Sequence, residues 1–104
     1  MKLLITLDSK VLEDTLKRIT NSVYHLLCNR EDGVDWEKPL ETLLVELVGM
    51  RDIAHQFEEP LFILICKLEG LFYLTSNDDF FLFRRTIFEC LNILNSMVNK
   101  LCHT

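Results

Sequence analysis

Two arginines interrupt apolar helical faces in this sequence, and they are the residues whose positions could support chemistry. When residues are placed at intervals of about 100° around a helix, Arg51 falls within a stripe of leucines and His55 lies close beside it. The same projection places Arg84 on an apolar side, four residues before Phe88. An arginine on such a face must extend its stem to solvent or find an acceptor, because burying an unpaired charge is costly. Glu69, in an otherwise apolar stretch, is the expected acceptor, and such an ion pair would set the register of the helices.

The stretch around Arg51 also offers a catalytic interpretation. It reads Arg-Asp-Ile-Ala-His-Gln-Phe and resembles the Arg-(Asn/Asp)-…-His-x-(Tyr/Phe) signature of HEPN domains, small all-helical proteins that include ribonucleases. In that family the Arg and His of two subunits meet at a dimer cleft and cut RNA without a metal, so the resemblance implies this role for Arg51 and His55. The chain leaves three residues between them, where the family leaves at least four. A metal-free ribonuclease is therefore the enzyme alternative, and the main prediction is a protein that is not an enzyme.

Other catalytic and metal-binding motifs are missing from the sequence. There is no glycine-rich phosphate loop, no Gly-x-Ser-x-Gly, and no pair of His and Cys clusters with zinc spacing. His25 and Cys28 are three residues apart and could share one face of a helix, but no second pair completes a tetrahedral site. We expect a surface histidine beside a half-buried thiol, and we predict neither a metal nor a cofactor.

Composition favours a cytoplasmic protein whose partner is another protein. The chain has 104 residues and a net charge of −5, which argues against a protein that binds a phosphate backbone through Lys and Arg. The four cysteines form no Cys-x-x-Cys pair, so we expect free thiols in a reducing compartment. The apolar run of residues 1–7 is too short for a signal peptide, and no stretch approaches the roughly 20 apolar residues of a membrane span.

The hydrophobic pattern predicts an all-α protein with one bundle-like domain over residues 1–104. Three glycines and two prolines leave room for long helices, expected at about 9–29, 36–57, 60–75 and 77–102. Short turns join them, so consecutive helices should pack antiparallel. Residues 2–7 remain open between a short strand and an extra helical turn. The run at 60–74 is apolar on almost every side, and we expect the other helices to enclose it.

The helix at 77–102 is apolar over more of its circumference than one bundle contact needs. Its main seam has 3-4-3-4 spacing, and further apolar residues widen it on one side. We predict a partner-binding surface there, formed by Phe81, Arg84, Phe88 and Val98. The alternative is that the 9–29 helix or the Met1–Leu7 segment covers this strip within one chain.

These observations favour a small acidic helical module for protein–protein interaction: an inhibitor, an immunity- or antitoxin-like partner, or an assembly subunit. Its partner would be another protein or a second copy of itself. Besides the HEPN-like ribonuclease, the remaining alternative is the small helical subunit of a nucleoprotein complex, such as a CRISPR effector. That role requires a basic stripe along the nucleic-acid backbone, and the sequence has only the isolated doublets Lys17-Arg18 and Arg84-Arg85.

Overall fold

The computed structural model describes residues 9–102 and confirms the predicted all-α, four-helix fold. In this part of the chain the α-helices are α1 (Ser9–Glu31), α2 (Glu37–Ile53), α3 (Glu58–Gly70) and α4 (Phe80–Cys102). Short 3-10 helices lie between them: η1 (His55–Phe57), η2 (Leu71–Tyr73) and η3 (Asn77–Asp79). The question of strand or helix at residues 2–7 lies outside the described residues.

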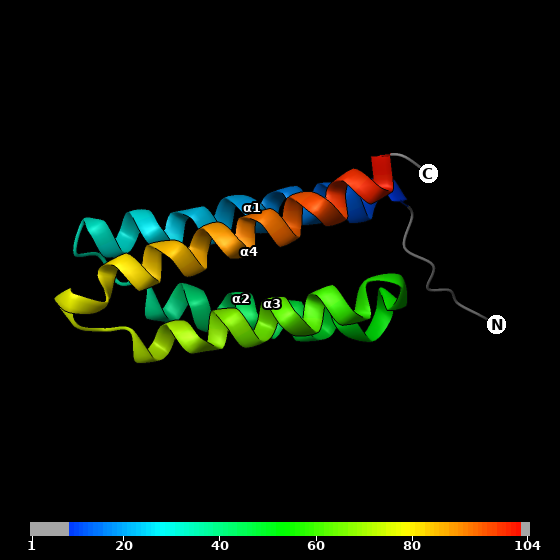
Figure 1. The fold of residues 1–104 in the computed structure, drawn as a ribbon. Coiled ribbons are helices and arrows are strands. Elements are labelled where there is room, and N and C mark those ends of the chain that lie inside the picture. The colour runs from blue at the N-terminus through cyan, green and yellow to red at the C-terminus, as the bar shows by residue number, and fades with distance from the viewer. Residues whose placement is uncertain (1–8, 103–104) are drawn as a thin grey trace.

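The helices form two layers of two (Figure 1). α1 and α4 lie side by side in one layer, and α2 and α3 form the other. Consecutive helices run antiparallel, as the short connections require. The bundle measures 50 × 26 × 21 Å, so it is elongated along the helix axes.

The core lies between the layers and consists of one apolar stripe from each helix. Apolar residues at helical spacing along one face of α1 are buried. The seam predicted for the last helix is buried at its central members, while Phe80 and Leu101 at its ends are partly covered. The buried side chains of these two helices are Leu12, Leu16, Ile19, Val23, Leu26, Leu27, Phe83, Ile87, Cys90, Leu94 and Met97. Burying a leucine-sized side chain stabilises the fold by about 1.5–3 kcal/mol, so these stripes hold the layers together.

The prediction that the 60–74 segment is enclosed on all sides is wrong. Leu61, Leu64 and Leu68 are fully buried, but Phe62 is 49% exposed and Ile63 is 41% exposed. In a bundle with two helices in each layer, every helix packs inward and along one flank, which leaves an outer face in water. α3 therefore occupies the same kind of position in the bundle as the other three helices, with one face buried and one face in water. Its apolar outer face needs a separate explanation.

The predicted boundary between the second and third helices also differs from the structure. The chain leaves the helical conformation at Ala54 (φ −100°, ψ 70°), forms η1, and begins α3 at Glu58, ahead of Pro60. A proline is tolerated there because the first amides of a helix have no partner within it. The break turns Phe57 inward, where it is 3% exposed, and this burial compensates for the lost helical hydrogen bonds.

The turn after α1 depends on a glycine. Gly33 has φ +72°, a left-handed conformation that costs a residue with a Cβ about 1–2 kcal/mol. Its amide donates to the carbonyl of Arg30 (3.3 Å), and the Val34 amide donates to the carbonyl of Asn29 (2.8 Å). These two bonds form a Schellman motif, which satisfies carbonyls at the end of the helix. Asp35 then accepts from the Glu37 amide (3.0 Å) at the start of α2.

Side-chain caps order the turn before the last helix. The Ser76 hydroxyl accepts a hydrogen bond from the amide of Asp78 (3.2 Å), and the Asp79 carboxylate accepts one from the amide of Ser76 (3.3 Å). This reciprocal pair is a capping box. It orders η3, from which the chain continues directly into α4.

Arg30, at the end of α1, ties this helix to the segment before α4. Its guanidinium donates to the carbonyl oxygens of Leu74 and Ser76, each at 2.9 Å. The same group lies 4.8 Å from the centre of the Phe83 ring and 5.6 Å from that of Phe80. Arg30 therefore closes one end of the bundle through hydrogen bonds and cation–π contacts.

Trp36 packs at the same end. Its ring meets the Phe83 ring edge-on with centres 4.9 Å apart, and it lies 6.4 Å from the Phe72 ring. One face of the connector between α1 and α2 is thus part of the apolar interior.

Candidate binding surfaces

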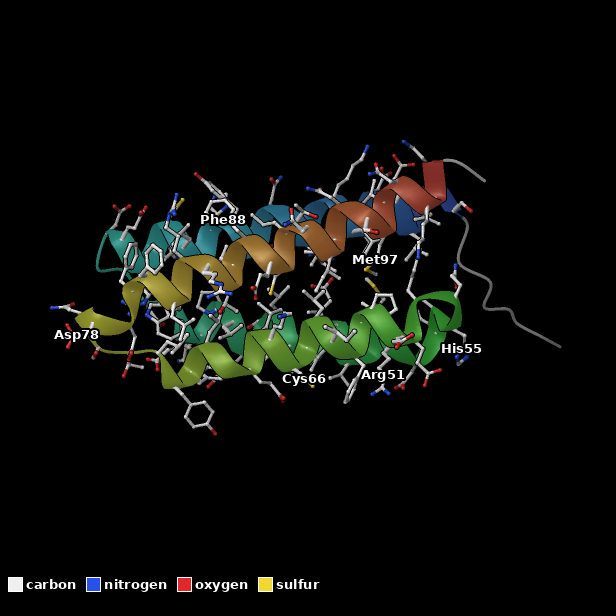
Figure 2. All side chains as sticks on the ribbon, in the orientation of Figure 1. Arg51, His55, Cys66, Asp78, Phe88 and Met97 are labelled. Carbon is white, nitrogen blue, oxygen red and sulfur yellow. The ribbon has the colours of Figure 1, made fainter. Side chains whose placement is uncertain are left out.

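An aromatic and basic cluster lies on the outer side of α4, where the sequence predicts a partner-binding surface. We call Phe81, Arg84, Arg85 and Phe88 the α4 surface. Phe81 is 74% exposed and Phe88 is 39% exposed. The Arg84 guanidinium lies 5.0 Å from the centre of the Phe88 ring, which is within cation–π distance. Figure 2 shows Phe88 projecting away from the α2–α3 layer.

The remaining residue of the predicted surface lies elsewhere. Val98 is only partly accessible and packs against the core, as Leu91 does two helical turns before it. The structure therefore brings Phe81, Arg84 and Phe88 together at the N-terminal half of α4 and separates Val98 from them. The proposed strip is covered within the chain along its C-terminal half and open at its N-terminal half.

The expected ion pair between a buried arginine and Glu69 does not form. Arg84 is exposed over Phe88, and Glu69 lines a shallow hollow with Leu44, Cys66 and Tyr73 on the α2–α3 side. The helical projection gives the angle of each residue around its own helix but not the angle at which two helices face each other. Glu69 and Arg84 consequently lie on different sides of the bundle.

Arg51 and His55, the residues of the ribonuclease alternative, lie at the junction of α2 and α3 (Figure 2). The Arg51 guanidinium stacks over the Phe62 ring at 4.8 Å, and its Nη2 lies 3.7 Å from a carboxylate oxygen of Glu58. His55 is exposed in η1. Arg51 thus reaches the surface along Phe62, as its long apolar stem allows.

His25 lies as the sequence predicts, on the surface beside a half-buried thiol. Its Nδ1 is 2.8 Å from the carbonyl oxygen of Asn21, and Cys28 is of intermediate exposure. Cys66 is an exposed free thiol, whereas burial raises the pKa of Cys90 to about 12. Cys90 therefore stays protonated and unreactive at neutral pH.

A second apolar surface, which the sequence reasoning missed, covers the outer side of α2 and α3. We call Val45, Val48, Phe62, Cys66 and Tyr73 the α2–α3 surface. Val45 is 74% exposed and Tyr73 is 84% exposed. Val48, at helical spacing from the leucines of α2, is half exposed. Phe62 and Cys66 are four residues apart and share one face of α3, away from the buried leucines of the same helix. Because this segment is apolar on almost every side, its sequence carries no signal for which face is exposed.

The two layers carry opposite net charges. Residues 9–31 and 80–102 contain seven Lys or Arg against four Asp or Glu, a net charge of +3 with neutral histidines. Residues 37–70 contain three Lys or Arg against seven Asp or Glu, a net charge of −4. The layers attract each other where their flanks meet: Arg18 pairs with Glu46, and Lys67 pairs with Glu89 at 3.1 Å. The Lys67 ammonium lowers the pKa of Glu89.

Neither a metal site nor a membrane-spanning helix is found in the part of the chain that the structure describes. Among residues 9–102, no three His, Cys, Asp or Glu side chains gather in a way that could hold a metal ion. None of the helices described there has both the length and the apolar content to cross a membrane. Comparison with protein-family models, curated proteins and solved structures finds no match to this chain. What the protein does must therefore be inferred from its own surfaces.

Proposed function

We propose that the protein is a non-catalytic helical module that binds another protein through the α4 surface. The observation that carries this proposal is the exposed Phe81 on the same face of α4 as Phe88, whose ring lies under the Arg84 guanidinium. Aromatic and arginine side chains supply much of the binding energy of protein interfaces. A helix presents them with little loss of conformational entropy on binding. Such a module serves as an inhibitor, an immunity- or antitoxin-like partner, or an assembly subunit.

The charge distribution supports a protein partner over a nucleic acid. A phosphate backbone is bound by Lys and Arg side chains that are available to it, and the net charge of this chain is −5. On the α1–α4 layer, several basic side chains are already in ion pairs one turn apart: Lys10 with Asp14, Lys17 with Glu13, and Arg85 with Glu89. The role of a nucleoprotein subunit is therefore the weaker alternative.

The free thiols support a cytoplasmic location. Cys28, Cys66 and Cys90 are unpaired, as is usual for proteins of a reducing compartment.

The ribonuclease alternative uses Arg51 and His55. It needs the Arg51 guanidinium to leave Phe62 and Glu58 before it can contact a phosphate.

The test is affinity purification of the protein from its native host, followed by reconstitution of the complex. Phe81→Glu is compared with the native protein and with Val11→Glu, a control that adds the same charge at a half-exposed apolar residue of α1. We expect the native protein and the control to retain one protein in a fixed ratio. We expect Phe81→Glu to bind it at least tenfold more weakly, because a charge replaces an aromatic anchor.

Two results would overturn the proposal. Equal retention of the partner by Phe81→Glu would exclude the α4 surface as the docking site. Cleavage of a mixed RNA pool by the purified protein, abolished in His55→Ala, would establish the ribonuclease alternative instead.

A further inference from the structure

We infer that the α4 surface of one copy binds the α2–α3 surface of another, so that the protein assembles head to tail. The partner at both surfaces is a second copy of this chain. The inference rests on the proposed binding role of the α4 surface and adds the identity of what it binds.

The two surfaces are complementary in chemistry. The α4 surface presents two aromatic rings with Arg84 and Arg85 between them in sequence. The α2–α3 surface presents Val45 and Tyr73, each flanked by a carboxylate one helical turn away: Glu41 before Val45 and Glu69 before Tyr73. Apolar groups on both sides would be removed from water while opposite charges meet at the edge, the arrangement that gives protein interfaces both affinity and specificity.

Symmetric pairing is disfavoured by the same charges. Two α4 surfaces placed face to face would bring two Arg84 and two Arg85 side chains together, of which Arg85 is neutralised in part by Glu89 at 3.5 Å. Two α2–α3 surfaces would bring the acidic layers together. Arg51, which lies over Phe62 of the second surface, is 3.7 Å from the Glu58 carboxylate, which neutralises it in part. Juxtaposed like charges suppress an association. The α4 surface should therefore bind the α2–α3 surface of another copy more tightly than it binds a second α4 surface.

The position of the surfaces determines what kind of assembly forms. The α4 surface lies on the α1–α4 layer, and the α2–α3 surface lies on the outer side of the other layer (Figures 1 and 2). A contact between unlike surfaces leaves one surface of each kind free at the ends of a dimer. Such a heterologous contact adds further copies rather than closing at two.

The size of the surfaces sets the expected strength. α2 has 17 residues, so it is about 25 Å long at 1.5 Å per residue, and two neighbouring helices cover a width of roughly 20 Å. This face is smaller than the roughly 800 Å² that each partner contributes to a standard stable interface. We therefore expect association in the micromolar range or weaker, with assemblies that lengthen as the concentration rises.

The test is sedimentation velocity of the full chain, from about 5 to 500 µM to span that affinity range, in low salt and in 1 M NaCl. We expect the average mass to rise continuously with concentration in low salt and to fall towards the monomer in high salt, because exposed charges are screened. Phe81→Glu and Val45→Lys each change a side chain that is 74% exposed, so both variants should fold, which circular dichroism checks. Each variant alone should be monomeric, since it has lost one of its two surfaces.

Mixing the two variants gives the decisive result. Phe81→Glu retains an intact α2–α3 surface, and Val45→Lys retains an intact α4 surface, so an equimolar mixture should form a 1:1 heterodimer and nothing larger. A native protein that is monomeric at every concentration overturns the inference. So does a mass that stops at the dimer, or a mixture that stays monomeric. The purification from the native host separates this inference from the proposed function. If the native protein retains a different protein there and Phe81→Glu does not, the proposed function stands without this inference.

Discussion

Replacing Arg30 with methionine should destabilise the protein by about 2 kcal/mol, because Arg30 joins the end of α1 to the segment before α4. Arg30→Met keeps the apolar stem and removes the guanidinium. The hydrogen bond to the part-buried Leu74 carbonyl is the larger loss, since a buried acceptor left without a donor costs about 1–3 kcal/mol. Water replaces the bond to the exposed Ser76 carbonyl at little cost. The contact with Phe83 contributes about 0.5–1 kcal/mol.

The loss is reduced by one favourable change, since the Arg30 Nε is buried without a hydrogen-bond partner and its removal relieves a desolvation cost. For a domain of this size a change of 1 kcal/mol shifts Tm by about 4–8 °C, so Arg30→Met should melt about 8–16 °C below the native protein. Thermal melts followed by circular dichroism at 222 nm measure this shift.

The matched control is Arg85→Met on the exposed face of α4. Arg85 makes an i,i+4 ion pair with Glu89 at 3.5 Å, and such pairs contribute only about 0.3–0.5 kcal/mol. Arg30→Lys should fall between the two, because an ammonium keeps a charged donor but lacks the planar guanidinium that stacks on the Phe83 and Phe80 rings. A melting temperature for Arg30→Met within 2 °C of the Arg85→Met value would refute the assignment of Arg30 as the connection between these segments.

Four further predictions concern the backbone, the thiols and the core. Gly33→Ala should lower the free energy of unfolding by about 1–2 kcal/mol, measured by urea denaturation, because Gly33 has a positive φ; an unchanged midpoint would contradict this. At pH 8, a thiol reagent should modify exposed Cys66 within minutes and leave Cys90 unmodified until the protein unfolds, as mass spectrometry of peptides would show. Above pH 9 the unfolded Cys90 thiol ionises while the folded one, with its pKa raised by burial to about 12, stays protonated; the stability should therefore fall as pH rises, by up to about 1.4 kcal/mol per pH unit, and Cys90→Ala should remove this part of the slope. Leu64→Asp should prevent folding because Leu64 is fully buried, whereas Phe62→Asp, two residues earlier at a half-exposed position, should give a folded protein; if both variants fold equally well, the orientation of α3 is wrong.

The sequence predicts the inner faces of α1 and α4 well, because a stripe at helical spacing needs only local information. Leu16 and Phe83, for example, are buried as their spacing requires. The orientation of α3 was not predictable in this way. A segment that is apolar on almost every side gives no angular signal, so Leu64 and Phe62 look alike in the sequence although one is buried and the other is half exposed.

The candidate site was only partly predictable for a related reason. The apolar side of α4 is wider than its seam, which indicates that apolar residues outside the seam are available for a further contact. Phe81 is one of them and is indeed exposed. The width does not say which part of the strip a neighbouring helix covers, and Val98 packs against the core. Arg30 and Trp36 were missed because their partners lie at residues 72–83, and nothing local to the first connector indicates those distant contacts.

α1 and α4 make the most extensive helix pair of the fold, yet they stand far apart in the sequence. During synthesis α1 leaves the ribosome first, and much of its apolar stripe lacks a partner until residues 80–102 have followed it. α2 and α3, joined by η1 with almost no intervening loop, can close as a hairpin earlier, since contacts between near neighbours in sequence form fastest. The nascent chain should therefore pass through a stage in which this hairpin is formed and α1 is exposed, and α1 is the segment that a chaperone would bind at that stage.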